Sequence, residues 1–246
     1  MSKLAIIGGT GLTSLKNLQI EQREVVHTPY GEPSAPLVHG RLGGTEVIFL
    51  PRHGSGHTIP PHKINYRANL WALKEQGVDQ IIAVNAVGGI RADMGPGVLV
   101  VPDQIVDYTW GRTHTYFEDG LEAVVHIDFT EPYSQALRSV LLNSAKVAGV
   151  SVIDGGTYAA TQGPRLESAA EIKRLERDGC DLVGMTGMPE AALARELEIA
   201  YAALAVVANW GAGKAAGEIT MEAIEACLND GMQKVRATLE QVSTQL

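Results

Sequence analysis

The sequence predicts one α/β domain over residues 1–246, built as a three-layer sandwich around a mixed, mostly parallel sheet. Short, almost unbroken apolar runs are typical of strands buried on both faces, and amphipathic segments of helix length lie between them. Several of these runs end in polar turns rich in glycine, which is where ligands bind in α/β sheets. The 246 residues, 45% hydrophobic and 20% charged, fit one globular domain.

The charge and the cysteines limit the classes of partner. A formal net charge of −8 repels nucleic acid and anionic membranes, so an anionic substrate needs a local cationic pocket. The apolar run Leu4–Ile7 is too short for a signal peptide, and no stretch is long enough to span a membrane. Cys180 and Cys227 are not spaced as a metal or redox pair. We expect a cytoplasmic protein that acts on a small molecule.

The first predicted strand, Leu4–Ile7, leads into the turn Gly8–Leu12. This turn lacks the third glycine of a dinucleotide-binding loop and the Gly-Lys-Ser/Thr of a P-loop. Its backbone N–H groups and the hydroxyl of Thr10 suit a single phosphate or sulfate instead. Further strands are predicted at Glu24–Thr28, Ala35–His39 and Glu46–Leu50.

The loop Pro51–His62 follows the last of these strands and carries candidate ligand groups. Arg52, beside His53, offers a planar fork of donors for an oxyanion. A metal site is the alternative, because the loop also contains His57 and His62. No Asp, Glu or Cys joins these histidines within the loop, so we favour an anion site and expect no metal.

A helix is predicted at Lys63–Gln76, with Gly77 as its stop, and a buried strand at Gln80–Val84. This strand leads into Asn85–Gly89, which is predicted as a turn of small residues that a ligand can approach closely. Two short strands are then expected, at Val98–Val101 and Gln104–Asp107.

The segment Trp110–Val125 is polar, aromatic and aperiodic, which predicts a long excursion over the surface, as a lid or a subunit contact. His126 lies at its end. Beyond it, an amphipathic helix is predicted at Pro132–Ala148 and a strand at Ser151–Ala160.

The strand Ser151–Ala160 leads into Thr161–Glu167, and Glu167 opens a predicted helix that runs through Arg177. A carboxylate at a helix N-terminus often only complements the helix dipole, so this role and ligand binding are both open for Glu167.

The turn Gly184–Gly187 holds Met185 and Thr186 between two glycines, and a helix with Pro189 in its first turn follows. The last elements are a strand buried on both faces and an amphipathic closing helix, predicted at Ile199–Ala208 and Glu218–Val242. The loop Asn209–Gly213 lies between them.

The polar groups of these turns are expected at one edge of the sheet, where the carboxyl ends of parallel strands meet. Hydroxyls, a guanidinium and small-residue turns together describe a phosphate site. Glu167 and Asn209 instead suit a planar ligand that forms hydrogen bonds. The whole set is Thr10, Arg52, His53, Asn85, Ala86, Glu167, Met185, Thr186 and Asn209.

Five motifs, in order and spacing, resemble those of the trimeric purine nucleoside phosphorylase and methylthioadenosine phosphorylase family. They are GGTGL at Gly8–Leu12, PRHGSGHTI at Pro51–Ile59, NAVGG at Asn85–Gly89, GPRLE at Gly163–Glu167 and GMTGMPE at Gly184–Glu190. The resemblance runs from about residue 4 to about residue 240. It implies phosphorolysis of a purine nucleoside to a base and a pentose 1-phosphate. It also implies no metal or organic cofactor, and a homotrimer with sites at subunit interfaces.

The resemblance assigns residues to parts of such a substrate. Phosphate contacts are implied for Thr10, Arg52, His53, Asn85, Ala86 and Thr186. Met185 is placed under the pentose, and Glu167, Asn209, Trp210 and Gly211 are placed around the base. His126 resembles a histidine lent across the subunit interface. Asn209 and His53 are the candidates for catalytic residues.

One departure from the family's methylthioadenosine members concerns the base. Those members carry aspartates where this chain has Asn209 and Gly211, and usually a serine where it has Glu167. An ionised Glu167 accepts a hydrogen bond from N1–H of hypoxanthine or guanine, whereas N1 of adenine is itself an acceptor. Because one buried unpaired group costs about 1–3 kcal/mol, we expect a 6-oxopurine.

A second departure concerns the 5′ end of the nucleoside. The family's 6-oxopurine members usually place a histidine near the 5′-hydroxyl, and the matching position here is Met221. A thioether suits an apolar 5′ substituent, although Met221 would also serve as a core residue at a helix start.

Together the two departures predict phosphorolysis of 5′-methylthioinosine to hypoxanthine and 5-methylthioribose 1-phosphate. The alternatives within the family are a purine nucleoside phosphorylase for inosine and guanosine, and a methylthioadenosine phosphorylase. Outside it, a non-catalytic nucleoside-binding protein and a metal-dependent hydrolase built on the loop histidines rank lower.

Overall fold

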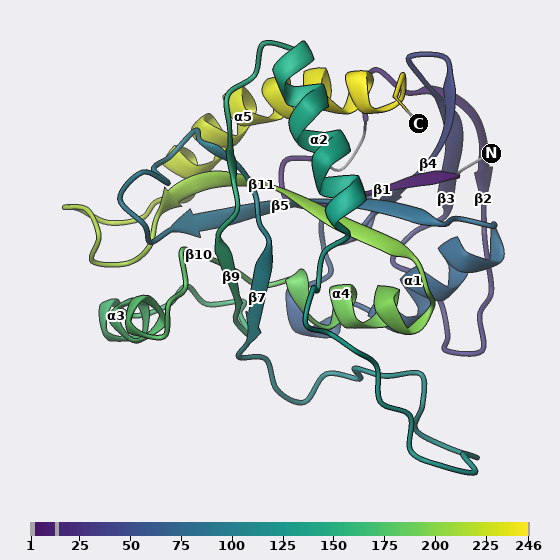
Figure 1. The fold of residues 1–246 in the computed structure, drawn as a ribbon. Helices are drawn as coiled ribbons and strands as arrows, with labels where there is room; N and C mark the ends of the chain where they lie inside the picture. Colours follow the sequence, from purple (N-terminus) through teal and green to yellow (C-terminus); the bar gives the residue numbers. More distant parts are fainter. Residues whose placement is uncertain (1–2, 13–14, 246) are drawn as a thin grey trace.

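A computed structural model describes residues 3–12 and 15–245 of the chain. Within these residues, one sheet of eleven strands runs through the molecule and helices cover both of its faces (Figure 1). Its main path is β2-β3-β4-β1-β5-β10-β9-β7, while β11 pairs with β5 and β6, and β6 pairs with β8. The strands are β1 (Leu4–Gly8), β2 (Gln19–Glu24), β3 (Leu37–Leu42), β4 (Thr45–Pro51), β5 (Gln80–Gly89), β6 (Leu99–Val101), β7 (Gln104–Asp107), β8 (Val152–Asp154), β9 (Thr157–Ala160), β10 (Leu182–Gly184) and β11 (Ala200–Trp210).

Parallel pairing predominates in this sheet. The parallel pairs are β1 with β4 and β5, β5 with β11, β9 with β7 and β10, and β6 with β8. The antiparallel pairs are β2 with β3, β3 with β4, β5 with β10, and β6 with β11. The predicted α/β architecture with a mixed, mostly parallel sheet is therefore confirmed.

The helices form the two outer layers. The helices α2 (Gln135–Val147) and α5 (Met221–Val242) share one apolar cluster with the sheet, and α1 (Tyr66–Glu75) and α4 (Gly187–Glu196) share the other. The helix α3 (Ala169–Arg177) packs in a smaller cluster with residues of β9 and β10, and the short 3₁₀ helix η1 (Pro61–Lys63) precedes α1. Figure 1 shows α2 and α5 above the sheet and α1 and α4 below it.

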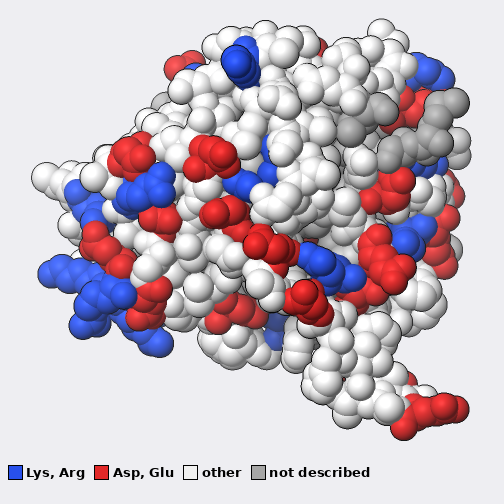
Figure 2. Space-filling view, in the orientation of Figure 1, with Lys and Arg blue, Asp and Glu red and all other residues white. Residues whose placement is uncertain are grey.

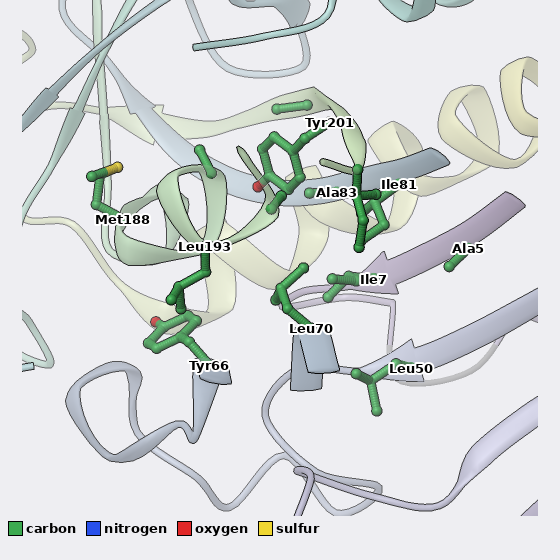
Figure 3. Packing of buried hydrophobic residues seen from close by; sticks show 14 of the residues in the cluster. Ala5, Ile7, Leu50, Tyr66, Leu70, Ile81, Ala83, Met188, Leu193 and Tyr201 are labelled. Carbon is green, nitrogen blue, oxygen red and sulfur yellow. The ribbon is translucent and has the colours of Figure 1, made fainter. Parts of the chain in front are cut away.

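The strand β1 shows how one apolar run supplies both clusters. All five of its residues are buried. Leu4 and Ile6 pack with α2 and α5, whereas Ala5 and Ile7 pack with α1 and α4 (Figure 3). Successive side chains of a strand point to opposite faces, so a strand covered on both faces needs an unbroken apolar sequence.

Four helices, α1, α2, α3 and α5, begin two or three residues later than the sequence pattern predicted, because polar side chains cap them. At each of these four starts, the side chain of the residue before the helix accepts a hydrogen bond from a backbone N–H of the first turn. These caps are Asn65 for α1, Ser134 for α2, Ser168 for α3 and Thr220 for α5. The cap at Ser168 leaves Glu167 outside α3.

The predicted single strand Ser151–Ala160 is wrong. The chain forms β8 and β9, which lie at different places in the sheet: β8 pairs with β6, and β9 pairs with β10 and β7. Gly155 and Gly156 separate them with φ angles of 86° and 131°, a backbone region that favours glycine.

The predicted turn Asn85–Gly89 is wrong as well, since β5 continues through it to Gly89. Likewise β11 continues past Ala208 to Trp210. The two strands support each other, with Asn209 opposite Gly88 and Trp210 opposite Gly89. A Cβ at Gly89 would lie 1.8 Å from the carbonyl oxygen of Met94, so the small residue serves close backbone packing.

The strand predicted at Glu24–Thr28 is displaced: β2 spans Gln19–Glu24 and is mostly exposed. It lies at the edge of the sheet and pairs only with β3 among the described strands. Its residues are mostly polar, so the sequence shows no apolar pattern that would mark a strand there. The strand β10 was not predicted at all, because three residues are too short for a periodic pattern.

Residues 108–134 contain no helix or strand and extend from the body at the lower edge of Figure 1, which confirms the predicted excursion. On the face in Figure 2, acidic side chains gather at the tip of this loop and basic ones over α3, with both signs mixed elsewhere. No helix in the described part of the chain is long and apolar enough to cross a membrane.

Candidate functional site

One cavity collects most of the residues that the sequence singled out. It lies where β1, β4, β5, β10 and β11 end or pass, and α5 closes one side of it. The predicted residues that line it are Thr10, Arg52, His53, Ala86, Glu167, Met185, Thr186, Asn209, Gly211 and Met221. Gly9, His57, Pro61, Leu166, Ile219 and Ile224 are among its other lining residues.

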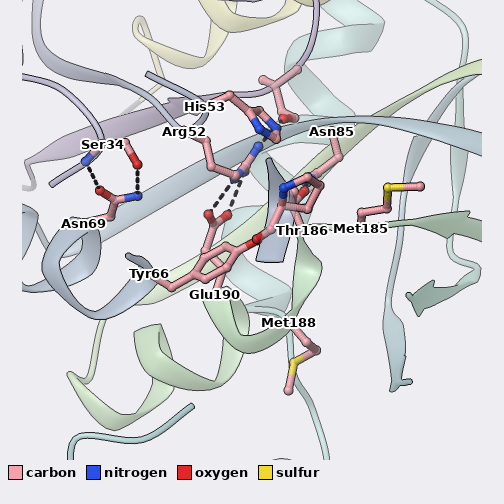
Figure 4. A network of polar contacts seen from close by, with 12 residues as sticks. Ser34, Arg52, His53, Tyr66, Asn69, Asn85, Met185, Thr186, Met188 and Glu190 are labelled. Atoms are coloured by element: carbon pink, nitrogen blue, oxygen red, sulfur yellow. Dashed lines mark hydrogen bonds and ion pairs between the residues drawn. The ribbon is translucent and has the colours of Figure 1, made fainter. Parts of the chain in front are cut away.

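Arg52 lines this cavity and is fully buried. The part of the cavity around Arg52 is here called the anion end. Its Nε and Nη2 donate to the two carboxylate oxygens of Glu190 at 2.6 and 2.7 Å, and its Nη1 donates to the carbonyl oxygen of Val84 at 3.1 Å (Figure 4). Burial alone would lower the pKa of Arg52, but the Glu190 carboxylate more than offsets this and raises it. Arg52 is therefore a fixed cation with N–H groups left for a ligand.

Glu190 is a residue that the sequence pattern did not bring to the site. It lies on α4, is fully buried, and also accepts a hydrogen bond of 2.8 Å from the hydroxyl of Tyr201. The sequence did contain one signal, a carboxylate among the apolar residues of that helix, because a buried charge needs a partner. The sequence around Glu190 does not show which cation that partner is.

His53 faces the cavity as a neutral ring. Burial, and next the charge of Arg52, lower the pKa of His53 to about 4. Its Nδ1 lies 2.8 Å from the carbonyl oxygen of Ile59, which can only accept, so Nδ1 carries the proton. This leaves Nε2 as an acceptor, suited to a protonated phosphate oxygen.

Thr186 and Asn85 form a buried pair beside Arg52 (Figure 4). The side-chain amide of Asn85 donates to Oγ1 of Thr186 at 2.9 Å. Thr186 lines the cavity, and its hydroxyl can donate to a ligand there. Asn85 itself is not among the residues that line the cavity, so its contact with the site runs through Thr186.

Glu167 and Asn209 lie at a second part of the cavity, with Gly211 and Leu166. The hydroxyl of Thr161 donates to Oε1 of Glu167 at 2.7 Å, which fixes the carboxylate. The acidic residue of the first turn of α3 is Glu171, which forms a capping box with Ser168. Because Glu171 already complements the N-terminus of α3, the helix does not need Glu167 for this purpose. This favours the ligand-binding role of Glu167.

The side chain of Asn209 is held at the end of β11. Its Nδ2 donates to the carbonyl oxygen of Trp210 at 2.8 Å, so one of its two amide hydrogens remains for a ligand. The Trp210 ring does not line the cavity; it covers Gly95 and lines a neighbouring cavity with Cys227.

Apolar groups surround a third part of the cavity at the start of α5. Met221 is the first residue of the helix and is 57% exposed, which argues against a core role. Ile219 and Ile224 lie beside it on the cavity wall. His126 is exposed on the loop 108–134 and does not line the cavity of this chain.

The histidines of the loop after β4 do not form a metal site in the described part of the chain. The rings of His53 and His57 are 4.7 Å apart between centroids. No group of three His, Cys, Asp or Glu side chains among the described residues is arranged to hold a metal ion.

The chain matches the family model described as the phosphorylase superfamily over residues 3–244. It is 60% identical over 242 residues to a "Probable S-methyl-5'-thioinosine phosphorylase" of Pseudomonas syringae pv. tomato, covering 98% of each chain. It is 48% identical over 226 residues to the "6-oxopurine nucleoside phosphorylase" of Pyrococcus furiosus, covering 89% of this chain and 84% of that protein.

Among solved structures, the methylthioadenosine phosphorylase from Schistosoma mansoni in complex with adenine superimposes with a TM-score of 0.96. The two sequences are 32% identical, and the match covers 100% of this chain and 92% of the other.

Proposed function

The chain belongs to the phosphorylase superfamily, and from this premise we propose that it cleaves 5′-methylthioinosine with phosphate to hypoxanthine and 5-methylthioribose 1-phosphate. The observation that carries the proposal is that one cavity joins an anion end, a hydrogen-bonding end and an apolar end. These ends match phosphate, a 6-oxopurine and a methylthio group. The relatives named for methylthioinosine and for 6-oxopurine nucleosides support the same base.

At the anion end, phosphate would lie among Thr10, Thr186, Arg52 and His53. The hydroxyls of Thr10 and Thr186 donate, and Arg52 supplies a fixed charge whose orientation is set by Glu190. Neutral His53 accepts a hydrogen bond from a protonated phosphate oxygen through Nε2, which orients an ionised oxygen toward the anomeric carbon. The two threonines and the guanidinium thus hold the nucleophile in position for attack.

At the base end, breaking the glycosidic bond develops positive charge on the pentose and negative charge on the purine. The free amide hydrogen of Asn209 donates to N7 of the leaving base, and such a positioned donor is worth about 3–4 kcal/mol by analogy with oxyanion-hole deletions. Glu167, held by Thr161, accepts from N1–H. This selects hypoxanthine over adenine, whose N1 carries no hydrogen.

At the third end, Met221, Ile219 and Ile224 offer an apolar surface for the 5′-methylthio group. Met185, between Thr186 and the base end, packs under the pentose. No metal or organic cofactor enters this scheme, since phosphate is a co-substrate.

We further infer that the protein is a cytoplasmic enzyme of purine salvage and works as a homotrimer with its sites at the subunit interfaces. The exposed His126 would then reach the site of a neighbouring subunit from the loop 108–134.

Initial rates on 5′-methylthioinosine, 5′-methylthioadenosine and inosine, each with and without phosphate, test the proposal. We expect phosphate-dependent cleavage with the highest kcat/KM for 5′-methylthioinosine. Preference for 5′-methylthioadenosine would contradict the roles of Asn209 and Glu167. Preference for inosine would leave the base assignment standing and remove Met221 from the 5′ end, in favour of the 6-oxopurine nucleoside phosphorylase alternative. Cleavage without phosphate would exclude a phosphorylase.

A further inference from the structure

Arg112 lies on the loop 108–134, yet its side chain is 8% exposed and turns into the body of the protein. Its Nη1 donates to the carbonyl oxygens of Met185 at 2.9 Å and Met188 at 2.6 Å. Its Nη2 donates to the carbonyl oxygens of Thr161 at 3.2 Å and Gln162 at 2.9 Å. Its Nε donates to the side-chain oxygen of Gln162 at 3.2 Å. One guanidinium thus meets four backbone carbonyls from two segments far apart in the sequence.

These two segments both line the ligand cavity. Met185 and Thr186 lie between β10 and α4, and residues 184–188, from the end of β10 to the start of α4, are here called the pentose turn. Thr161 belongs to the turn after β9, here called the base turn (residues 161–167), and its hydroxyl holds the carboxylate of Glu167. A shift of Arg112 would therefore be transmitted to both turns.

A third contact reaches the loop after β4. Nη1 of Arg112 lies 3.2 Å from the hydroxyl oxygen of Tyr66, and the guanidinium lies 5.6 Å from the centre of that ring. The hydroxyl of Tyr66 in turn donates to the carbonyl oxygen of Pro61 at 3.0 Å, and Pro61 lines the cavity. Arg112 is consequently the point where three walls of the cavity are joined.

All acceptors of Arg112 are neutral. It takes part in none of the ion pairs among the described residues, whereas the other deeply buried arginines, Arg52 and Arg138, pair with Glu190 and Asp154. A buried cation without an ionised partner is costly for the folded state alone, and an anionic ligand nearby lowers that cost. The residue next to Met185 is Thr186, on the anion end of the cavity.

We propose that Arg112 is a positioning residue that holds the pentose turn, the base turn and the Tyr66–Pro61 contact in one arrangement. Its effect on the reaction rests on the proposed function, because it acts through Met185, Thr186 and Glu167. A guanidinium is suited to this task, since five N–H groups in a rigid plane reach acceptors on several sides. A lysine keeps the charge but offers three donors from a single point.

The test compares Arg112→Met and Arg112→Lys with Arg138→Met. Arg138 is a matched control, because it is 7% exposed, donates to the carbonyl oxygens of Val101 and Pro102, and does not line the cavity. Steady-state rates and thermal unfolding are measured for all three variants. The assay uses whichever nucleoside the wild-type enzyme cleaves, so a wrong substrate assignment shows in the wild-type rates alone.

For Arg112→Met we expect kcat/KM to fall about 100-fold, as for a misplacement of about 1 Å at a reacting centre. Arg112→Lys should recover the KM for phosphate, because the charge is kept, but not kcat. Arg138→Met should lose thermal stability with kcat/KM within about threefold of wild type, a change below ~1 kcal/mol. The proposal is overturned if Arg112→Met and Arg138→Met lose kcat/KM equally. If Arg112→Met does not fold, unchanged kcat in Arg112→Lys overturns it.

Discussion

At the scale of single residues, the site is defined by pairs rather than by isolated groups. Arg52 is aligned by Glu190, the hydroxyl of Thr186 by Asn85, and the carboxylate of Glu167 by Thr161. In each pair, the second residue uses up one bonding direction of the first and leaves another for a ligand. The buried ion pair has the largest energetic consequence, since breaking it leaves a guanidinium without its counter-charge.

Glu190→Gln should lower the free energy of unfolding by about 3–5 kcal/mol, because the buried Arg52 would lose its ionised partner. Urea unfolding measures this change. The exposed pair of Arg41 and Glu46 supplies the control, and Glu46→Gln should cost less than about 1 kcal/mol. Equal costs for the two variants would contradict the structural role of Glu190.

Asn209→Asp should shift the base preference toward 6-aminopurines. A carboxyl group at this place can protonate N7 and accept from a 6-amino group, which the amide of Asn209 does less well. The measurement is the ratio of kcat/KM for 5′-methylthioadenosine and 5′-methylthioinosine. A ratio that stays the same in the variant would show that Asn209 does not select the base.

Met221→His should raise kcat/KM for inosine relative to 5′-methylthioinosine by about 10-fold, because a ring nitrogen can bond the 5′-hydroxyl where a thioether cannot, a gain of ~1.4 kcal/mol. Met221→Leu is the matched control, which keeps an apolar side chain and should leave the preference unchanged. If both variants behave alike, the 5′ end of the nucleoside lies elsewhere in the cavity.

At the scale of elements, the cavity depends on two long strands and one helix. The strands β5 and β11 run side by side past the point where their apolar sequences end, and so bring Ala86 and Asn209 to the cavity. The helix α5 supplies Met221 and Ile224 and packs along β11. Its distance from the sheet is set by Gly231, because a Cβ there would lie 2.4 Å from Cγ1 of Val206.

Gly231→Ala should destabilise the protein by about 1–3 kcal/mol, because the added methyl overpacks the contact with Val206. Helix propensity alone predicts the opposite, an increase in stability of about 1 kcal/mol. Thermal unfolding of the variant decides between the two expectations. The exposed Ala226 of the same helix is the reference, and Ala226→Gly should cost only the propensity of about 1 kcal/mol. A more stable Gly231→Ala protein would mean that α5 adjusts without strain.

At the scale of the whole molecule, two parts of the loop 108–134 differ in their surroundings: one is bound to the body of the protein and the other is exposed. Arg112 ties its start to the cavity of its own chain. The part around His126 is exposed and carries the exposed apolar residues Leu121, Val124 and Val125. An exposed apolar segment of this kind is typical of an interface between proteins. It fits the proposed trimer, in which His126 reaches a neighbouring site.

Two inactive variants should therefore restore each other's activity when they are co-expressed. Glu167→Ala removes a base contact within one chain, and His126→Ala removes the proposed contact across the interface. A mixed trimer contains a site with Glu167 from one subunit and His126 from the next, so activity should exceed that of either variant alone. Light scattering gives the oligomeric state. Monomers, or trimers without restored activity, would contradict a shared site.

The sequence by itself determined the α/β class, the excursion and ten of the residues that line the cavity. Alternation of apolar runs and amphipathic helices is a local pattern, and β1 shows why a strand that supplies both layers must be apolar throughout. The position of several site residues at one edge of the sheet could be predicted from topology, because they lie in turns that follow strand ends. These residues are Thr10, Arg52, His53 and Thr186.

Only the tertiary structure decided how these groups are held. Glu190 lies 138 residues from Arg52, and Arg112 lies 73 residues from the carbonyl of Met185. The split of residues 151–160 into two strands and the extension of β5 and β11 were also set by pairing between distant segments. No local periodicity encodes such contacts, because a buried charge or an unpaired carbonyl requires a partner but does not specify where in the chain that partner lies.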